Sequence, residues 1–178
     1  MNTSVGVTIR PYSRADLWLL DRTLGDASQM VYLGGPENEE KLRERHGKFV
    51  ALSADPGKGC MFVITSGPEN VAAGTVGYWE RDWEAQKVWE TGWFVLPEFQ
   101  GRGIATAATR LIIEHVSRLH SHRYLYAFPS VENGPSNAIC RKLRFTQLEA
   151  RDFEYPHKSG KYIRCNIWQL NLIADAPI

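Results

Sequence analysis

One stretch of this chain, residues 95–105, joins the end of an apolar strand to the start of an amphipathic helix. The turn between them carries Gly101, Arg102 and Gly103. A helix leaves its first backbone N–H groups without partners, and its dipole places roughly half a positive charge there. Glycine lets the turn adopt positive φ and lets a ligand approach the backbone, while the arginine adds a cation. The sequence therefore predicts a phosphate-binding turn.

Length and charge narrow the class of protein. The chain has 178 residues and a formal net charge of +1. We expect one domain over residues 1–178, and the small net charge argues against a nucleic acid as the main partner. The three cysteines are widely spaced and no histidine cluster has metal-ligand spacing, so we predict no disulfide framework and no metal site. Without a leader-like segment or an apolar run near ~18 residues, we expect a cytoplasmic protein that crosses no membrane.

Hydrophobic periodicity predicts helices and strands in a mixed order. The expected strands cover residues 8–10, 60–65, 71–79, 88–95, 124–128, 147–155 and 161–172. The expected helices cover residues 37–53, 103–120 and 135–143, and another begins after Ser13, with Asp16 as its capping-box acid. The three strands from 60 to 95 read as an antiparallel meander.

The step from residue 88 to residue 128 is a strand, a helix and a second strand. Such a step is a right-handed crossover, so its two strands run parallel in one sheet. We therefore expect an α+β fold in α/β/α layers, with a mixed, mostly antiparallel central sheet and helices on both faces.

Two motifs fall on these elements. Gln100-x-x-Gly103-x-Ala105 opens the helix from 103, and Asn133-x-x-Ser136 precedes the run Arg-Lys-Leu-Arg-Phe at 141–145. With their separation, they resemble the signatures of the GNAT superfamily of acyl-CoA-dependent N-acyltransferases, and the resemblance covers nearly the whole chain. Residues 33–36 and 90–93 look most like those of the ribosomal-protein N-terminal acetyltransferases.

The resemblance implies a GNAT fold, in which two parallel strands splay apart in a V. It implies acetyl-CoA as co-substrate, with its pyrophosphate on the glycine turn and its pantetheine arm between the strands that end at Val95 and Phe128. The acetyl group would pass by direct attack in a ternary complex to a primary amine, on a protein N-terminus or a small molecule. A homodimer stays open, because many members dimerise. The residues implied for cofactor binding are Phe94, Val95, Gln100, Gly101, Arg102, Gly103, Ile104, Ala105, Thr106, Asn133 and Ser136.

Acyl transfer to an amine needs a base, because an alkyl amine is protonated at neutral pH. Glu90 is the first candidate, with Glu80 and Glu84 behind it, because a carboxylate inside an apolar strand suits a cleft. Its structural alternative is an edge or solvent-facing carboxylate paired with a cation. The usual acid of the superfamily, a tyrosine, is replaced by Cys140, so Cys140 and Ser136 are the candidate proton donors. Their structural alternatives are a small core residue and a helix cap, respectively.

The segment at residues 79–84 is too polar and too aromatic for an ordinary turn, and it predicts a wall that recognises a cationic or aromatic amine. Aromatic residues on strands otherwise pack in the core or across strands. The polar hairpin near residues 156–161 is a second acceptor-side segment. The candidate substrate residues are Trp79, Glu80, Trp83, Phe128 and Tyr155.

Two rival functions share parts of this pattern. A dinucleotide-binding Rossmann fold also places Gly101-x-Gly103 between a strand and a helix, but Thr106 stands where its third glycine belongs, and no convincing acidic residue ends the next strand. A catalytically silent acyl-CoA-binding regulatory protein on the GNAT fold is the stronger alternative, because Cys140 replaces the usual acid.

Overall fold

A mixed seven-stranded sheet forms the centre of the molecule in the computed structural model, which describes residues 6–155 and 160–173. The strand order is β1-β2-β3-β4-β5-β7-β6. Neighbouring strands are antiparallel except β4 and β5, which are parallel. The strands are β1 (Val7–Pro11), β2 (Gly59–Ser66), β3 (Val71–Trp83), β4 (Gln86–Val95), β5 (Tyr124–Ala127), β6 (Thr146–Glu154) and β7 (Tyr162–Asn171).

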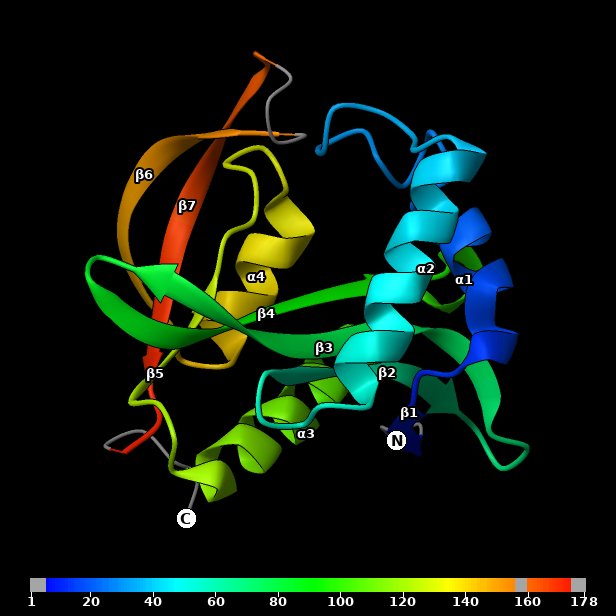
Figure 1. Cartoon of the computed structure of the whole chain (residues 1–178), viewed down its shortest axis with the longest axis horizontal. Coiled ribbons are helices and arrows are strands. Elements are labelled where there is room, and N and C mark those ends of the chain that lie inside the picture. Colours follow the sequence, from blue (N-terminus) through cyan, green and yellow to red (C-terminus); the bar gives the residue numbers. More distant parts are fainter. Residues whose placement is uncertain (1–5, 156–159, 174–178) are drawn as a thin grey trace.

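Helices cover both faces of this sheet (Figure 1). Helices α1 and α2 pack on one face, whereas α3 and α4 share a core on the other. Their bounds are α1 (Leu17–Thr23), α2 (Glu39–Ser53), α3 (Ile104–Leu119) and α4 (Gly134–Lys142), with short 3₁₀ turns at Arg14–Asp16 and Pro97–Phe99. The expected α+β fold, with its mostly antiparallel sheet and one parallel pair, is confirmed. Within the described residues, no helix is long and apolar enough to cross a membrane.

Helix starts follow local capping signals, with two corrections. Ser13 and Asp16 form the predicted capping box, which opens the 3₁₀ turn that leads into α1. Helix α2 is capped by Asn38 and begins at Glu39 rather than at 37. Helix α4 is capped by Asn133, whose Oδ1 accepts the N–H of Ser136 at 3.0 Å. The alternative role of Ser136 as helix cap is therefore wrong, because its backbone is the group being capped.

Strand β3 is longer than the sequence pattern predicted. Its pairing with β4 continues as far as Trp83↔Gln86, so most of the segment 79–84 is strand. The turn consists of Glu84 and Ala85, with φ of 49° and 63°. Positive φ at both positions is what a two-residue type I′ hairpin requires. Because strand side chains alternate, positions 79, 81 and 83 face one side of the sheet and positions 80 and 82 face the other.

A buried amide fixes the segment before α4. Asn137 is 4% exposed, and its Nδ2 donates to the carbonyl oxygens of Ser130 at 2.9 Å and Asn133 at 2.8 Å. Its Oδ1 accepts from Asn166 Nδ2 and from Trp168 Nε1, both at 2.8 Å. The bond to Asn133 is local to the start of α4, whereas the other three reach the loop at Ser130 and strand β7, so Asn137 ties α4 and this loop to β7.

We predict that Asn137→Leu lowers the free energy of unfolding by about 2–4 kcal/mol, because it removes four hydrogen bonds, two of them buried, and leaves the buried Trp168 indole N–H without its acceptor. Urea unfolding measures the change. Gln147→Ala is the matched control, because the Gln147 side-chain amide makes an exposed hydrogen bond to Asn166 at 3.0 Å. This substitution should lower the free energy of unfolding by about 0.5 kcal/mol or less. Equal losses in the two variants would contradict the role of Asn137.

Candidate active site

Strands β4 and β5 are paired over a very short length and then part. Their pairing consists of Trp89↔Leu125 and Glu90↔Tyr126. Beyond Glu90, β4 continues to Val95 in partnership with β3. The edge of β4 that faces β5 is therefore open from residue 91 onward, as the V-shaped splay requires.

The glycine turn lies at the end of this open edge. Gly101 and Gly103 have φ of 72° and 76°, the left-handed region that favours glycine. Gly103 is the N-cap of α3 and carries no side chain to cap it. The first intrahelical bond runs from Ala107 N to Gly103 O, so the N–H groups of residues 104–106 have no partner within the helix. These uncapped amides fit an anionic phosphate group.

The ladder between β3 and β4 decides which backbone groups face the opening. Leu96 N donates to Ala73 O at 2.8 Å. Bonding alternates along an antiparallel ladder, so the backbone N–H and C=O of Phe94 point toward β3 and those of Val95 point toward the splay. This direction argues against the predicted binding of pantetheine by the Phe94 backbone, whereas the Val95 backbone has the required direction.

Gln100 links the glycine turn to its surroundings. Its Nε2 donates to Val95 O at 2.9 Å and to Gln29 Oε1 at 3.1 Å. The motif glutamine thus folds the turn back onto the end of β4 and also contacts the segment between α1 and α2. Arg102 is exposed, with its guanidinium 5.8 Å from the ring centroid of Phe99.

On the far side of the splay, Asn133 and Ser136 stand at the start of α4. The Oδ1 atom of Asn133 is used in capping, so the amide nitrogen is the part of this side chain that suits a ligand acceptor. Ser136 is half-buried in the first turn of α4. Both residues keep positions compatible with the cofactor side predicted for them.

Glu90 lies on the same sheet face as α1 and α2. Val88 belongs to one apolar cluster on this face and Phe94 packs against another, so Glu90 stands between them. Its side chain is 16% exposed, and its Oε2 lies 2.6 Å from Arg81 Nη1. Burial raises the pKa of Glu90, against the lowering effect of Arg81 and of a hydrogen bond from the Trp79 indole. Glu90 is thus ion-paired, as its structural alternative expected, but it is buried rather than facing solvent.

Trp79 forms the floor beside this carboxylate. A Cβ on Gly92 would come within 3.0 Å of the Trp79 ring, so the absence of a side chain at residue 92 makes room for the indole. Trp79 pairs with Glu90 across β3 and β4, and the two side chains share a face. An aromatic surface therefore lies directly next to the candidate base.

Trp83 and Phe128 belong to an aromatic cluster at the other side of Glu90. Trp83 is 9% exposed, and its ring centroid lies 5.0 Å from that of Phe128 and 5.9 Å from that of Phe153. Trp83 is largely a core residue, which removes it from the predicted acceptor wall. Phe128 is half-buried and stacks on Arg81, with 4.3 Å from the guanidinium carbon to the ring centroid.

The other two carboxylates named from the sequence do not join the site. Glu80 faces the opposite side of the sheet, where it bonds Lys87 Nζ at 2.8 Å and His122 Nε2 at 3.2 Å. Its hydrogen bond with Lys87 lowers its pKa. Glu84 is a turn residue that pairs with Arg151 at 2.7 Å. Strand alternation and the hairpin turn account for both corrections.

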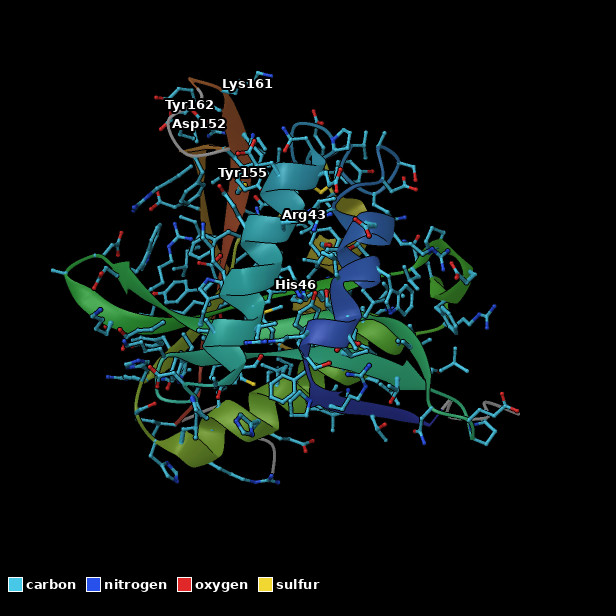
Figure 2. The ribbon with its side chains drawn as sticks, turned by 45° about the vertical axis from the view of Figure 1, so that its right-hand side comes forward. Arg43, His46, Asp152, Tyr155, Lys161 and Tyr162 are labelled. Atoms are coloured by element: carbon cyan, nitrogen blue, oxygen red, sulfur yellow. The ribbon has the colours of Figure 1, made fainter. Side chains whose placement is uncertain are left out.

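Tyr155, directly after the end of β6, contacts helix α2. Its hydroxyl accepts from Arg45 Nη2 at 3.4 Å, and Arg45 also forms an ion pair with Glu37. Burial raises the pKa of Tyr155. In Figure 2 Tyr155 lies between the β6–β7 hairpin and α2, while Asp152, Lys161 and Tyr162 lie farther out on the hairpin. The rest of the predicted acceptor hairpin, residues 156–159, lies outside the described residues.

Cys140 lies in the core beneath α4. The side chain is fully buried among the apolar residues between α3 and the sheet, and burial raises its pKa to about 12. Burial in this environment suits a small apolar residue. This location argues against the predicted role of Cys140 as a proton donor.

The family is decided by comparison with known proteins. The model of the acetyltransferase (GNAT) domain matches residues 7–146. The chain belongs to the GNAT acetyltransferase family. Comparison with curated protein sequences gave no match.

Solved structures share the fold of this GNAT chain. A spermidine N-acetyltransferase from Vibrio cholerae, in complex with CoA and spermine, has a TM-score of 0.77 at 18% identity, covering 96% of this chain and 98% of its own. An acetyltransferase from Salmonella typhimurium that modifies the N-terminal serine of ribosomal protein L7/L12 has a TM-score of 0.74 at 19% identity, covering 96% and 97%. A GNAT-family acetyltransferase from Bacillus anthracis has a TM-score of 0.75 at 18% identity, covering 94% and 95%.

Two residues of this GNAT site were missed by the sequence reasoning. Arg81 stands in the segment that was singled out, and its signal was the Trp-x-Arg-x-Trp alternation from 79 to 83, which puts all three side chains on one face. Gln29 carries no local signal, because its contact with Gln100 joins segments far apart in sequence. Among the described residues, no three His, Cys, Asp or Glu side chains gather so that they could hold a metal ion.

We predict that Gly103→Ala lowers the free energy of unfolding of this GNAT domain by about 1 kcal/mol, because φ is 76° while a Cβ would meet nothing within 4 Å. Gly47→Ala is the control: it lies inside α2, also with nothing within 4 Å, and alanine there should stabilise by about 0.5–1 kcal/mol. Thermal or urea unfolding reports both changes. The same sign in the two variants would contradict left-handed strain at the turn.

Proposed function

We propose that this chain is an N-acetyltransferase that moves an acetyl group from acetyl-CoA to a primary amine by direct attack in a ternary complex. The observation that carries the proposal is a buried carboxylate, Glu90, at the residue where β4 and β5 part. The opening leads from there to the uncapped N-terminus of α3. A thioester donor and a base would thus meet at one place.

The cofactor side is built from backbone groups. The amides of residues 104–106 and the left-handed glycines would hold the pyrophosphate, with Arg102 as an additional cation. The exposed edge of β4 at Val95 would bond the pantetheine arm as an added strand does. When bound, acetyl-CoA supplies the acetyl group as an activated thioester.

Glu90 has the properties of a general base in this proposal. Burial raises the pKa of its carboxyl, and the ion pair with Arg81 acts in the opposite direction. A raised pKa makes a carboxylate a better proton acceptor than a free one. It would take a proton from the acceptor ammonium or amine on the face covered by α1 and α2. The Trp79 indole beside it would contact the acceptor chain.

The proposal assigns no dedicated proton donor. A thiol has a pKa of about 8.5, so its thiolate is a fairly stable leaving group at neutral pH. Ser136 is half-buried on the cofactor side and stays the remaining side-chain candidate. Cys140 is left out because of its position in the core.

For the acceptor we propose a primary amine, on a small molecule or at a protein N-terminus. Structural relatives include enzymes described as acting on spermidine and on the N-terminal serine of L7/L12. The aromatic floor of Trp79 and the ion-paired Glu90 suit an amine with a cationic form. A test panel therefore contains spermidine and short peptides that begin with serine.

The alternative is a silent acyl-CoA-binding protein on the same fold, which is favoured by the buried cysteine at the position of the usual acid. Calorimetry with CoA and a thiol-release assay with acetyl-CoA separate the two functions. Binding of CoA without thiol release on any amine would favour the silent protein. Failure to bind CoA would overturn both.

We predict that Glu90→Gln lowers kcat/KM by about 10²-fold to 10⁴-fold, the contribution expected of general base catalysis, while CoA affinity is unchanged. Thiol release from acetyl-CoA with the best acceptor measures the loss. Glu80→Gln is the control, because Glu80 lies on the opposite face with Lys87 and His122. Loss of activity in the control equal to that in Glu90→Gln would refute the assignment.

We predict that Cys140→Ala leaves kcat at its wild-type value and lowers the free energy of unfolding by about 1–2 kcal/mol, because it removes a fully buried side chain. Cys60→Ala, at a second buried cysteine, should behave alike. Steady-state kinetics and urea unfolding measure the two effects. A selective collapse of kcat in Cys140→Ala, with stability retained, would restore the role of proton donor.

A further inference from the structure

Arg81 occupies an aromatic clamp, which we define as the rings of Trp83, Phe128 and Phe153. The guanidinium carbon lies 4.3 Å from the ring centroid of Phe128, 5.3 Å from that of Trp83 and 5.4 Å from that of Phe153. All three distances are within the range of cation–π attraction. The cation is therefore held among flat apolar surfaces, and its side chain is 29% exposed.

The clamp joins strands from both sides of the splay. Arg81 and Trp83 come from β3, Phe153 comes from β6, and Phe128 directly follows β5. From this position Arg81 Nη1 reaches Glu90 Oε2 on β4 at 2.6 Å. A single guanidinium thus connects Glu90, the last residue of β4 that pairs with β5, to aromatic rings on the β5 and β6 side.

Glu90 needs such a partner because of its surroundings. It stands between two apolar clusters, where a carboxylate loses most of its hydration. The other groups near it are the Trp79 indole from β3, the Cys165 thiol from β7 and, next to Cys165, Asp152 from β6. None of these three groups is positively charged, so the positive charge beside Glu90 comes from Arg81.

We propose that Arg81 is a positioning residue, which holds the Glu90 carboxylate ionised and correctly oriented at the start of the splay because the aromatic clamp fixes its guanidinium. This inference rests on the proposed function, in which Glu90 is the base. The aromatic clamp fixes the position of the Arg81 guanidinium, and the ion pair with this guanidinium orients the Glu90 carboxylate. Arg81 itself takes no proton and touches no substrate in this role.

The sign of the pH effect follows from the charge. A base is active above its pKa, and activity falls as the pH drops through that value. Removing the cation makes the ionised carboxylate less stable, so the pKa of Glu90 rises further. The acidic limb of the kcat/KM profile should then begin at a higher pH.

The test compares Arg81→Gln, Arg81→Lys and Arg151→Gln. Arg151 is the matched control, because its guanidinium carbon also lies 5.3 Å from the Trp83 ring centroid, but its partners are Glu84 and Glu149. The first readout is a ¹³C NMR titration of the Glu90 carboxyl, assigned with Glu90→Gln, and the second is the pH profile of kcat/KM. Thermal unfolding checks that each variant is folded.

In Arg81→Gln we expect the Glu90 titration and the acidic limb to move up together by about one to three on the pH scale. In Arg81→Lys, which keeps the charge without the planar fork, the titration should stay near that of the wild type while kcat falls. Arg151→Gln should match the wild type in both readouts.

Two results would overturn the inference: an unchanged Glu90 titration in Arg81→Gln, or an Arg81→Lys enzyme with wild-type kcat. A purely structural role would lower activity equally at every pH and would leave the titration in place. Because the NMR titration needs no turnover, it tests Arg81 even where no amine is acetylated. Absence of acetyl transfer by the wild type would count against the proposed function instead.

Discussion

The separation of β4 from β5 after Glu90 is the constraint on which the rest of the structure depends. Parallel strands normally continue their ladder, and an opened edge leaves backbone N–H and C=O groups that need partners. Here the Val95 carbonyl meets the Gln100 amide, which folds the glycine turn onto the end of β4. The same opening places the uncapped amides of α3 beside the open edge. The open edge of β4 and the uncapped amides of α3 suit a ligand that supplies both an anion and hydrogen-bonding groups.

A second constraint is electrostatic and acts at the base of the opening. Glu90 stands in an apolar stretch, where burial favours its protonated form, and Arg81 opposes that effect at 2.6 Å. Both effects act on the pKa of Glu90, and the effect of burial is the larger one. Arg81 in turn packs against Phe128 and Phe153, so the proposed positioning of Glu90 on β4 involves aromatic rings that lie beyond β5.

Local patterns predicted much of this protein. The capping box of Ser13 and Asp16, the apolar face of α3 and the positive φ of Gly101 and Gly103 depend on neighbours in sequence, and all are found. The predictions that the structure does not support concern the side of the sheet that a residue faces and the residues that it contacts. Glu80 and Phe94 were assigned to the site, but alternation along β3 and the ladder with β4 turn the Glu80 side chain and the Phe94 backbone away. A strand shifted by one residue exchanges its two faces, and nothing local in the sequence shows which face a cleft occupies.

The sequence by itself determined the glycine turn before α3 and the order of helices and strands, because backbone geometry and amphipathic period are properties of short segments. Only the tertiary structure decided that Glu90 pairs with Arg81, that Cys140 belongs to the core, and that Gln100 contacts Gln29. Those facts depend on contacts between residues far apart along the chain. The physical reason is that burial and ion pairing are set by the packing of elements against one another, whereas the turn needs only its own glycines and the helix that follows it.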